Sequence, residues 1–136
     1  MKIHKILVFF ITLFAITTSG FSEEIVLDNR SSHPNKDLNS KIAIQWVSTA
    51  KEVDEGNKAL IFGIKLNPNT IQFLEQSGKI TLTIPKNAEY FRVLVWSKNE
   101  ENPDLLTNWV DVIPKKTYTL DANHLVPAVL MSGTGC

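Results

Sequence analysis

The chain has 136 residues, with 14 basic and 14 acidic side chains and a single cysteine. This length supports one compact domain with its own hydrophobic core and is short for two. The balanced charge, without long runs of one sign, excludes the basic surface of a nucleic-acid-binding protein, and the single cysteine excludes an intramolecular disulfide. The fold must therefore depend on packing.

The first 22 residues have the pattern of a cleaved signal peptide. Lys2 and Lys5 precede an apolar run at 6–16, and small residues follow at 17–20. Cleavage is expected before Glu23 or after Gly20. The apolar run is about half of the roughly 20 residues that a membrane-spanning helix needs, so no stable membrane insertion is expected after cleavage. The mature chain is predicted to be secreted or periplasmic.

Residues 23–40 are predicted to form an N-terminal strand and a mobile polar arm. Residues 41–47 fit two patterns, because Ile42, Ile44 and Trp46 alternate as in a strand but also belong to a helical stripe. We favour the strand, since Ile, Trp and Val suit a pleated surface. A polar turn is predicted at 51–57, and the alternating apolar residues of 58–66 predict another strand.

The second half of the chain carries further short strands. Asn67 as a cap, Pro68 in a first turn and Gly78 as a stop predict one short helix or helical turn over 68–77. Strands are predicted at 80–84, 90–97, 109–113, 117–120 and 125–131, with a polar surface loop at 98–108. The domain is therefore predicted to span 41–131, with a flexible tail at 132–136.

Seven or eight short strands separated by turns predict a mostly β fold, a single antiparallel β-sandwich. An α+β sheet with the helix on one face is the alternative. The arrangement resembles the immunoglobulin-like or transthyretin-like sandwiches of bacterial envelope and secreted proteins. The resemblance covers most of the mature chain but includes no specific motif, so it implies an architecture and assigns no functional residue.

Motifs for catalysis or cofactor binding are missing from the sequence. It has no Gly-rich phosphate loop, no paired cysteines, no His-Glu-x-x-His and no Gly-x-Ser-x-Gly. The mature chain contains two histidines, His33 and His124, which we interpret as solvated loop residues rather than zinc ligands. We therefore expect no metal and no cofactor.

Acidic residues offer a candidate for acid–base chemistry. Glu100, Glu101 and Asp104 lie close together in the 98–108 loop, and Asp111 lies in the strand that follows. Paired carboxylates catalyse hydrolysis when their surroundings separate their pKa values, whereas adjacent acids in a loop are usually solvated. A small secreted hydrolase that uses loop carboxylates or His124 is the alternative function.

The strand at 90–97 presents the strongest candidate binding surface. Phe91, Val93 and Val95 form an apolar face suited to a core, which leaves Tyr90, Arg92 and Trp96 on the opposite face with Leu94. Tyr, Trp and Arg are enriched at binding hot spots. Two interpretations remain open. The row is exposed and binds a partner, with Asp111 as a further candidate, or the strand is covered on both sides and Arg92 pairs with a carboxylate such as Asp111.

Cys136, the last residue, is either a thiol without a role or the site of an intermolecular disulfide. The second interpretation predicts a disulfide-linked dimer. The expected function is a non-enzymatic binding or interaction module of the bacterial cell envelope or medium that contacts a protein or glycan partner. The absence of nucleophile and base signatures, together with the aromatic and arginine residues, favours binding over hydrolysis.

Overall fold

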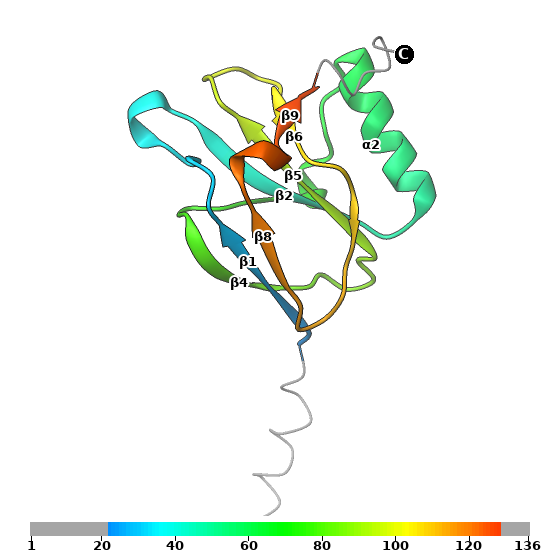
Figure 1. The fold of residues 1–136 in the computed structure, drawn as a ribbon. Helices are drawn as coiled ribbons and strands as arrows, with labels where there is room; N and C mark the ends of the chain where they lie inside the picture. The colour runs from blue at the N-terminus through cyan, green and yellow to red at the C-terminus, as the bar shows by residue number, and fades with distance from the viewer. Residues whose placement is uncertain (1–21, 129–136) are drawn as a thin grey trace, which may run out of the picture.

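The computed structural model of the chain describes residues 22–128, and these are built mainly from β-strands (Figure 1). The elements in chain order are β1 (Glu24–Asn29), β2 (Lys41–Val47), α2 (Ala50–Phe62), β3 (Ile71–Phe73), β4 (Gly78–Thr83), β5 (Tyr90–Trp96), β6 (Leu105–Leu106), β7 (Val110–Asp111), β8 (Thr117–Leu120) and β9 (Val126–Pro127). Short 3-10 turns lie at Lys36–Leu38, Pro68–Thr70 and Ala122–His124. The predicted signal peptide, except Ser22, and the C-terminal tail with Cys136 lie outside the described residues.

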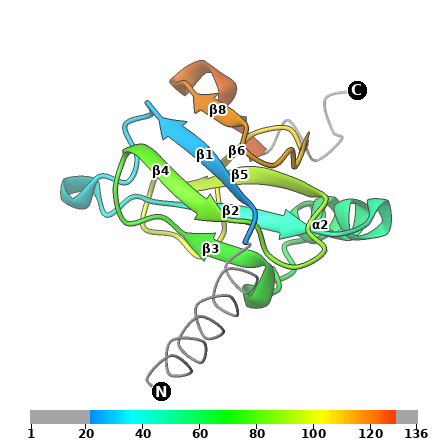
Figure 2. The same cartoon turned by 90° about the horizontal axis from the view of Figure 1, so that it is seen from below.

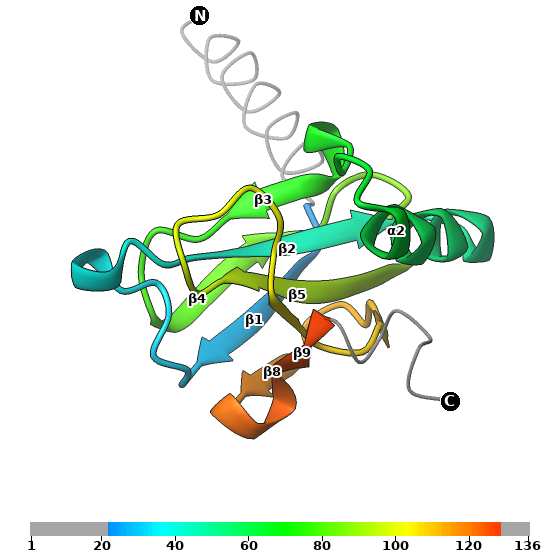
Figure 3. The ribbon, with the colours of Figure 1, turned by 90° about the horizontal axis from the view of Figure 1, so that it is seen from above.

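The strands form two sheets. One has three strands in the order β4-β1-β8, and the other has six, ordered β3-β2-β5-β6-β9 with β7 also paired to β5. In Figures 2 and 3, β1 and β4 lie in one layer and β2, β3 and β5 in the other. The expectation that all pairs are antiparallel is wrong at β1 and β8, which run parallel. The chain enters β8 beside the start of β1, where the N–H of Lys115 donates to Glu24 O at 2.7 Å.

A shared hydrophobic core lies between the two sheets. Its buried members are Ile25, Leu27, Ile42, Ile44, Trp46, Leu74, Leu82, Phe91, Val93, Val95 and Leu120. These residues alternate along β2 and β5, which confirms that Phe91, Val93 and Val95 form the core face of β5. The strand predicted at 41–47 is likewise confirmed as β2. The described residues are thus mostly β, with two sheets and one α-helix in a sandwich-like arrangement.

The prediction of a turn at 51–57 and a strand at 58–66 is wrong, because α2 spans Ala50–Phe62. A capping box starts this helix: Thr49 Oγ1 accepts from the N–H of Glu52 at 3.1 Å, and the Glu52 carboxylate accepts from the N–H of Thr49 at 3.2 Å. Gly63 ends it with φ +67, a left-handed conformation that glycine adopts easily. The alternation of Leu60, Phe62 and Ile64 mimicked a strand pattern across this helix end.

The short helix or helical turn predicted over 68–77 is confirmed only as the 3-10 turn Pro68–Thr70, and the rest of the segment is not helical. Asn67 caps a turn as expected, with its Oδ1 accepting from the N–H of Asn69 at 3.0 Å, but this turn is a single 3-10 turn. The chain then joins the edge of β2 as β3, where Gln72 lies opposite Ile44. Trp46 Nε1 donates to Gln72 Oε1 at 3.0 Å. Sheet pairing therefore replaces the helix that the local signals indicated.

The polar segment that follows β1 is closed by hydrogen bonds. Asn29 Nδ2 donates to His33 O at 2.8 Å, and Ser40 Oγ accepts from the N–H of Asn35 at 2.7 Å and lies 2.9 Å from His33 Nδ1. Asn29, Ser31 and Ser40 are buried. The loop thus has internal bonding that the polar sequence did not predict.

Arg92 fixes the helix α2 on the outer face of β5. Its side chain is 1 % exposed, and it donates from Nε to Gln45 Oε1 at 2.7 Å, from Nη1 to Asn57 Oδ1 at 3.0 Å and from Nη2 to the carbonyl of Gly56 at 3.2 Å. The guanidinium lies 4.3 Å from the ring centroid of Trp109. Trp109 Nε1 donates to the same Asn57 oxygen at 3.0 Å. We call these five residues the Arg92 cluster.

The Arg92 cluster holds a buried cation with neutral partners. Among the described residues, the ion pairs are Arg30 with Asp28 and Lys58 with Asp54, so the predicted pairing of Arg92 with a carboxylate such as Asp111 is wrong. Burial lowers the pKa of Arg92 to about 10, which leaves it charged at neutral pH. Burying a charge is costly, so each acceptor around it matters for stability.

Gly56 lets the helix approach this closely. It is the buried residue of α2, and a Cβ at this position would lie 3.3 Å from both Arg92 Nη2 and the Trp109 ring. A residue that weakens isolated helices is therefore favoured here, because a larger side chain would press on Arg92 and Trp109.

Asn57→Ala is expected to destabilise the protein by about 1–3 kcal/mol, because it leaves the N–H groups of Arg92 and Trp109 without their shared acceptor in a buried site. Denaturant unfolding monitored by tryptophan fluorescence measures the change. Glu55→Ala, at the exposed neighbouring position of the same helix, is the matched control and should stay within about 0.5 kcal/mol of the parent. Equal stability of the two variants would contradict the role of the Arg92 cluster.

Candidate functional site

The predicted binding row on β5 does not form an exposed surface. Arg92 lies beneath α2, and Trp96 is 8 % exposed, with its Nε1 donating to Glu101 O at 3.1 Å and its ring 5.3 Å from that of Phe73. Tyr90 is half-buried, and Asp111 lies opposite it on β7 with an exposed side chain. The strand is therefore covered on both faces. Partner binding by these residues stays an untested prediction, and burial removes Arg92 and Trp96 from the accessible surface.

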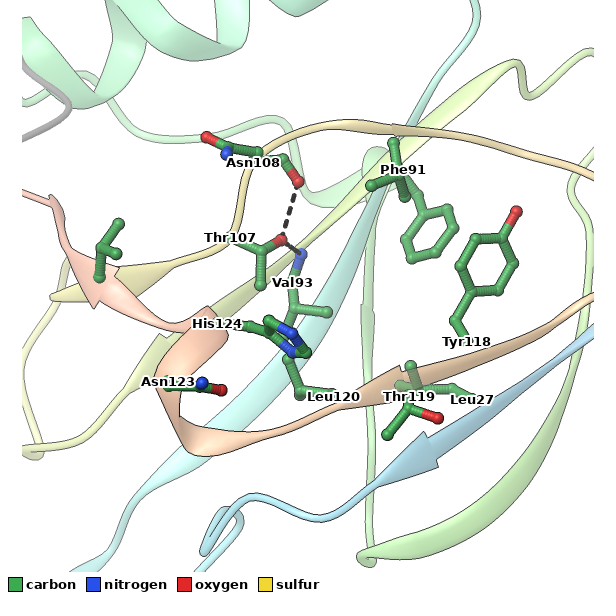
Figure 4. Close-up of a pocket in the computed structure, with 12 residues that line it drawn as sticks. Leu27, Phe91, Val93, Thr107, Asn108, Tyr118, Thr119, Leu120, Asn123 and His124 are labelled. Atoms are coloured by element: carbon green, nitrogen blue, oxygen red, sulfur yellow. Dashed lines mark hydrogen bonds between the residues drawn. The ribbon is translucent and has the colours of Figure 1, made fainter.

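A pocket of about 410 Å³ opens on the other face of β5, between the two sheets. We call it the inter-sheet pocket (Figure 4). Its lining is Leu27, Phe91, Val93, Thr107, Asn108, Val110, Tyr118, Thr119, Leu120, Asn123, His124 and Val126. These residues come from β1, β5, β7, β8, β9 and the segments that connect strands. The pocket thus depends on chain segments that are far apart in sequence.

An interruption in strand pairing forms one wall of the inter-sheet pocket. β6 pairs with Leu94 and Val95, and β7 pairs with Tyr90 and Phe91, so neither strand covers the middle of β5. There Thr107 substitutes for a strand: its Oγ1 accepts from the N–H of Val93 at 2.9 Å, and its own N–H donates to Val93 O at 3.0 Å. The backbone of β5 stays satisfied while the wall remains open.

The floor of the pocket is apolar and partly aromatic. Leu27, Phe91, Val93 and Leu120 are core residues whose inner sides reach the pocket. Tyr118 packs edge-on against Phe91 with ring centroids 4.9 Å apart, as Figure 4 shows. An apolar floor of this kind favours a ligand group with hydrophobic surface.

The rim of the pocket is polar but uncharged. Asn108, Thr119 and Asn123 contribute amide and hydroxyl groups, and no Asp, Glu, Lys or Arg is among the lining residues. Thr107 Oγ1 donates to Asn108 O at 3.0 Å, so its hydroxyl proton is not available for a hydrogen bond to a ligand. The pocket is therefore suited to a neutral group that can exchange hydrogen bonds at its rim.

The imidazole of His124 is among the side chains that line the pocket. Its Nδ1 accepts from the N–H of Asp121 at 2.9 Å, so the neutral ring carries its proton on Nε2. The backbone around it forms the 3-10 turn Ala122–His124 between β8 and β9. Of the residues that the sequence analysis named as candidates for catalysis, His124 is the one that lines the inter-sheet pocket.

The loop carboxylates do not join His124. Glu100 and Glu101 are exposed, and they lie in the loop whose carbonyl at Glu101 accepts from Trp96 on the outer face of β5. Within residues 22–128, no three His, Cys, Asp or Glu side chains lie close enough together to hold a metal ion.

Asp104 holds the base of the 97–104 loop. Its carboxylate accepts from the N–H of Ser97 at 2.7 Å and from the Ser97 hydroxyl. Burial raises the pKa of Asp104, but these hydrogen bonds, its own backbone N–H and the charge of Lys98 outweigh that effect and lower the pKa overall. A lowered pKa keeps the carboxylate ionised, which suits a structural acceptor rather than a general acid.

Sequence patterns missed the polar rim of the pocket. Asn108 was predicted to lie in a surface loop at 98–108, and it lies in a connecting segment, although β6 (Leu105–Leu106) interrupts that loop; Asn123 lies in the 3-10 turn Ala122–His124. Their polarity and turn-forming type were visible in the sequence, but the convergence of the two turns on one pocket was not. No signal in the sequence relates 107–108 to 119–124.

No family model, curated protein or solved structure matches the chain. None of the helices in residues 22–128 is both long and apolar enough to cross a bilayer.

Asp104→Asn is expected to lower thermal stability at neutral pH, because an amide cannot accept both Ser97 hydrogen bonds as an ionised carboxylate does. The lowered pKa means that the ionised carboxylate stabilises the fold above the ordinary pKa of aspartate, and this contribution is lost as the pH falls through the folded-state value. Melting curves of variant and parent should therefore converge on acidification. Glu100→Gln, in the same loop, should instead follow the parent at every pH.

Proposed function

We propose that the chain is an exported, non-enzymatic binding module of the bacterial cell envelope or surrounding medium. It contacts a protein or glycan partner and takes one uncharged group of that partner into the inter-sheet pocket. The observation that carries the proposal is the combination of an apolar, aromatic floor with a neutral hydrogen-bonding rim. The charged start, apolar run and small residues of the first 22 positions support export.

The size and lining of the pocket support this assignment. Its volume of about 410 Å³ falls within the range of ligand pockets. Phe91 and Tyr118 provide ring surface for an aromatic side chain or the apolar face of a sugar, and Asn108 and Asn123 provide both donors and acceptors. A charged group would enter without a countercharge, so ionic ligands are disfavoured.

The architecture is compatible with such a role. We propose that the two sheets form a β-sandwich of the immunoglobulin-like or transthyretin-like type, in which loops at the ends of the sheets commonly contact partners. The parallel pairing of β1 with β8 is a specific feature that this assignment must accommodate. The type of sandwich does not by itself indicate a ligand.

A second proposal is a small secreted hydrolase that uses His124. The supporting observation is that His124 lines the pocket with its Nδ1 fixed by the N–H of Asp121. A fixed imidazole can serve as a general base through its other nitrogen. The lining offers Thr107 and Thr119 as hydroxyl groups, but the Thr107 proton is donated to Asn108 O, so binding remains the better-supported function.

The binding proposal is tested with two probes, N-acetyl-tryptophanamide for a protein side chain and chitobiose for a glycan. We expect at least one to shift the backbone amide NMR signals of Thr107, Asn108 and Asn123 in a saturable manner. Val110→Trp, at a partly exposed lining position, should fill the pocket and abolish the shifts without unfolding the protein. Asn69→Trp, at an exposed position outside the pocket, is the matched control and should retain them.

Absence of saturable shifts with both probes, or shifts that survive in Val110→Trp, would overturn the assignment of the pocket as the binding site. The choice between the two probes identifies whether a protein or a glycan group is preferred.

The hydrolase proposal makes a different prediction. Protein recovered from the exported fraction should cleave a nitrophenyl ester or glycoside, and His124→Gln should abolish turnover while leaving the melting temperature nearly unchanged, because His124 is exposed. Turnover that persists in His124→Gln would contradict this role.

A further inference from the structure

Among residues 22–128, no strand pairs with the outer edge of β4, which is a free edge of the three-stranded sheet. β4 is the end strand of the order β4-β1-β8, and Figure 1 shows it outermost beside β1. It spans six residues, Gly78–Thr83, and pairs along its whole length with β1. Edge strands expose unpaired N–H and C=O groups that can accept another strand. β3, the corresponding edge of the larger sheet, has only three residues.

The register identifies which backbone groups of β4 point outward. Ile84 lies opposite Glu23 in the continuation of the β1–β4 register, and its N–H donates to Glu23 O at 2.8 Å. Hydrogen-bonding directions alternate along an antiparallel strand. The groups of Ile80 and Leu82 therefore point toward β1, and those of Lys79, Thr81 and Thr83 point away from it.

The opposite edge of β1 confirms this direction. Val26 N–H donates to Lys116 O at 3.0 Å, on the β8 side, and Val26 is the β1 partner of Thr81. Since Val26 directs its backbone away from β4, Thr81 directs its own away from β1. Within residues 22–128, no hydrogen bond uses the backbone N–H or C=O of Lys79, Thr81 or Thr83.

We propose that this edge binds a second copy of the chain, with two β4 strands pairing antiparallel about a twofold axis at Thr81. In that register Thr81 lies opposite Thr81 of the partner subunit. Lys79 then lies opposite the partner's Thr83, and Ile80 lies opposite the partner's Leu82. The two three-stranded sheets become one continuous six-stranded sheet across the dimer.

Charge favours this register. Lys79 meets a threonine rather than a second lysine, and β1 places Asp28 beside Lys79 and Glu24 beside Thr83. The row across the junction thus reads Asp28, Lys79, the partner's Thr83 and the partner's Glu24, with no like charges opposite one another. Adjacent strands are about 4.8 Å apart, so the partner's Glu24 lies two strands from Lys79 and attracts it weakly.

The two faces of β4 also match across the axis. Ile80 and Leu82 face the core, Ile80 only partly buried, so pairing with the partner's Leu82 and Ile80 extends the apolar layer. Lys79, Thr81 and Thr83 are exposed on the other face and stay polar. A shift of one residue would place apolar residues opposite polar ones.

The test measures mass by sedimentation velocity over a micromolar concentration series, in reducing agent so that Cys136 cannot link the chains. Protein recovered from cells that express the full chain should reach twice the monomer mass. Thr81→Pro should abolish the dimer, because proline removes an outward N–H that β1 does not use. Thr81→Val keeps this N–H and is the matched control, in which the dimer should persist.

A charge exchange tests the twofold register. Thr81→Lys and Thr81→Glu each place like charges opposite one another and should weaken self-association by about fivefold, whereas their mixture should form a heterodimer at least as tight as the parent. A monomer at every concentration, a dimer unchanged by Thr81→Pro, or a mixture no tighter than either charged variant alone would overturn the proposal. Monomeric behaviour would leave an extended strand of another protein as the remaining candidate for this edge.

Discussion

A single buried guanidinium constrains both the helix and one of the sheets. Within the described part of the chain Arg92 is enclosed without a carboxylate, so three neutral oxygens and the face of Trp109 must replace the water it would otherwise have. Those groups come from β2, from two adjacent residues of α2 and from the segment between β6 and β7. An unpaired buried charge costs several kcal/mol. The need to contact the Arg92 guanidinium therefore holds β2, α2 and the segment between β6 and β7 together. Apolar packing adds to these polar contacts, since Leu60 of α2 packs against the buried residues Ala43, Leu94, Trp96 and Leu106.

The same segment serves the inter-sheet pocket on the other side of β5. Trp109 points to the outer face and covers Arg92, whereas Thr107 bonds to the backbone of Val93 beside the pocket. If residues 107–109 continued β6 into β7 as a regular strand, the side chains of Thr107 and Trp109 would lie on the same face, because side chains two positions apart in a strand share a face. The two residues could then not serve opposite faces of β5. The interruption thus satisfies the guanidinium on one face and opens the pocket wall on the other.

The two faces of β5 differ in electrostatics in a way that bears on binding. The outer face encloses a cation that is inaccessible and whose three nitrogens each donate a hydrogen bond, so it offers little to a ligand. The inner face opens at its middle into a pocket lined by neutral side chains and backed by rigid core residues. Binding groups supported by a packed core are held in place before a ligand arrives, which lowers the entropy lost on binding. The free edge of β4 is a separate surface whose chemistry is that of backbone hydrogen bonds.

Local sequence patterns determined the strand faces and several turns. Alternation along β5 predicted its core side correctly, and the alternating apolar residues of β2 and β4 also face the core, because a strand's side-chain period is fixed by its covalent geometry. The helix α2 was also encoded locally, by Thr49 and Glu52 as a capping box. The alternating apolar residues within 60–64 nevertheless led to the prediction of a strand there. Only tertiary structure decided that Ile71–Phe73 becomes a strand, since the edge of β2 supplies its hydrogen bonds. Likewise, Arg92 is buried and the pocket exists because residues distant in sequence converge there, and that convergence depends on packing, which no local pattern specifies.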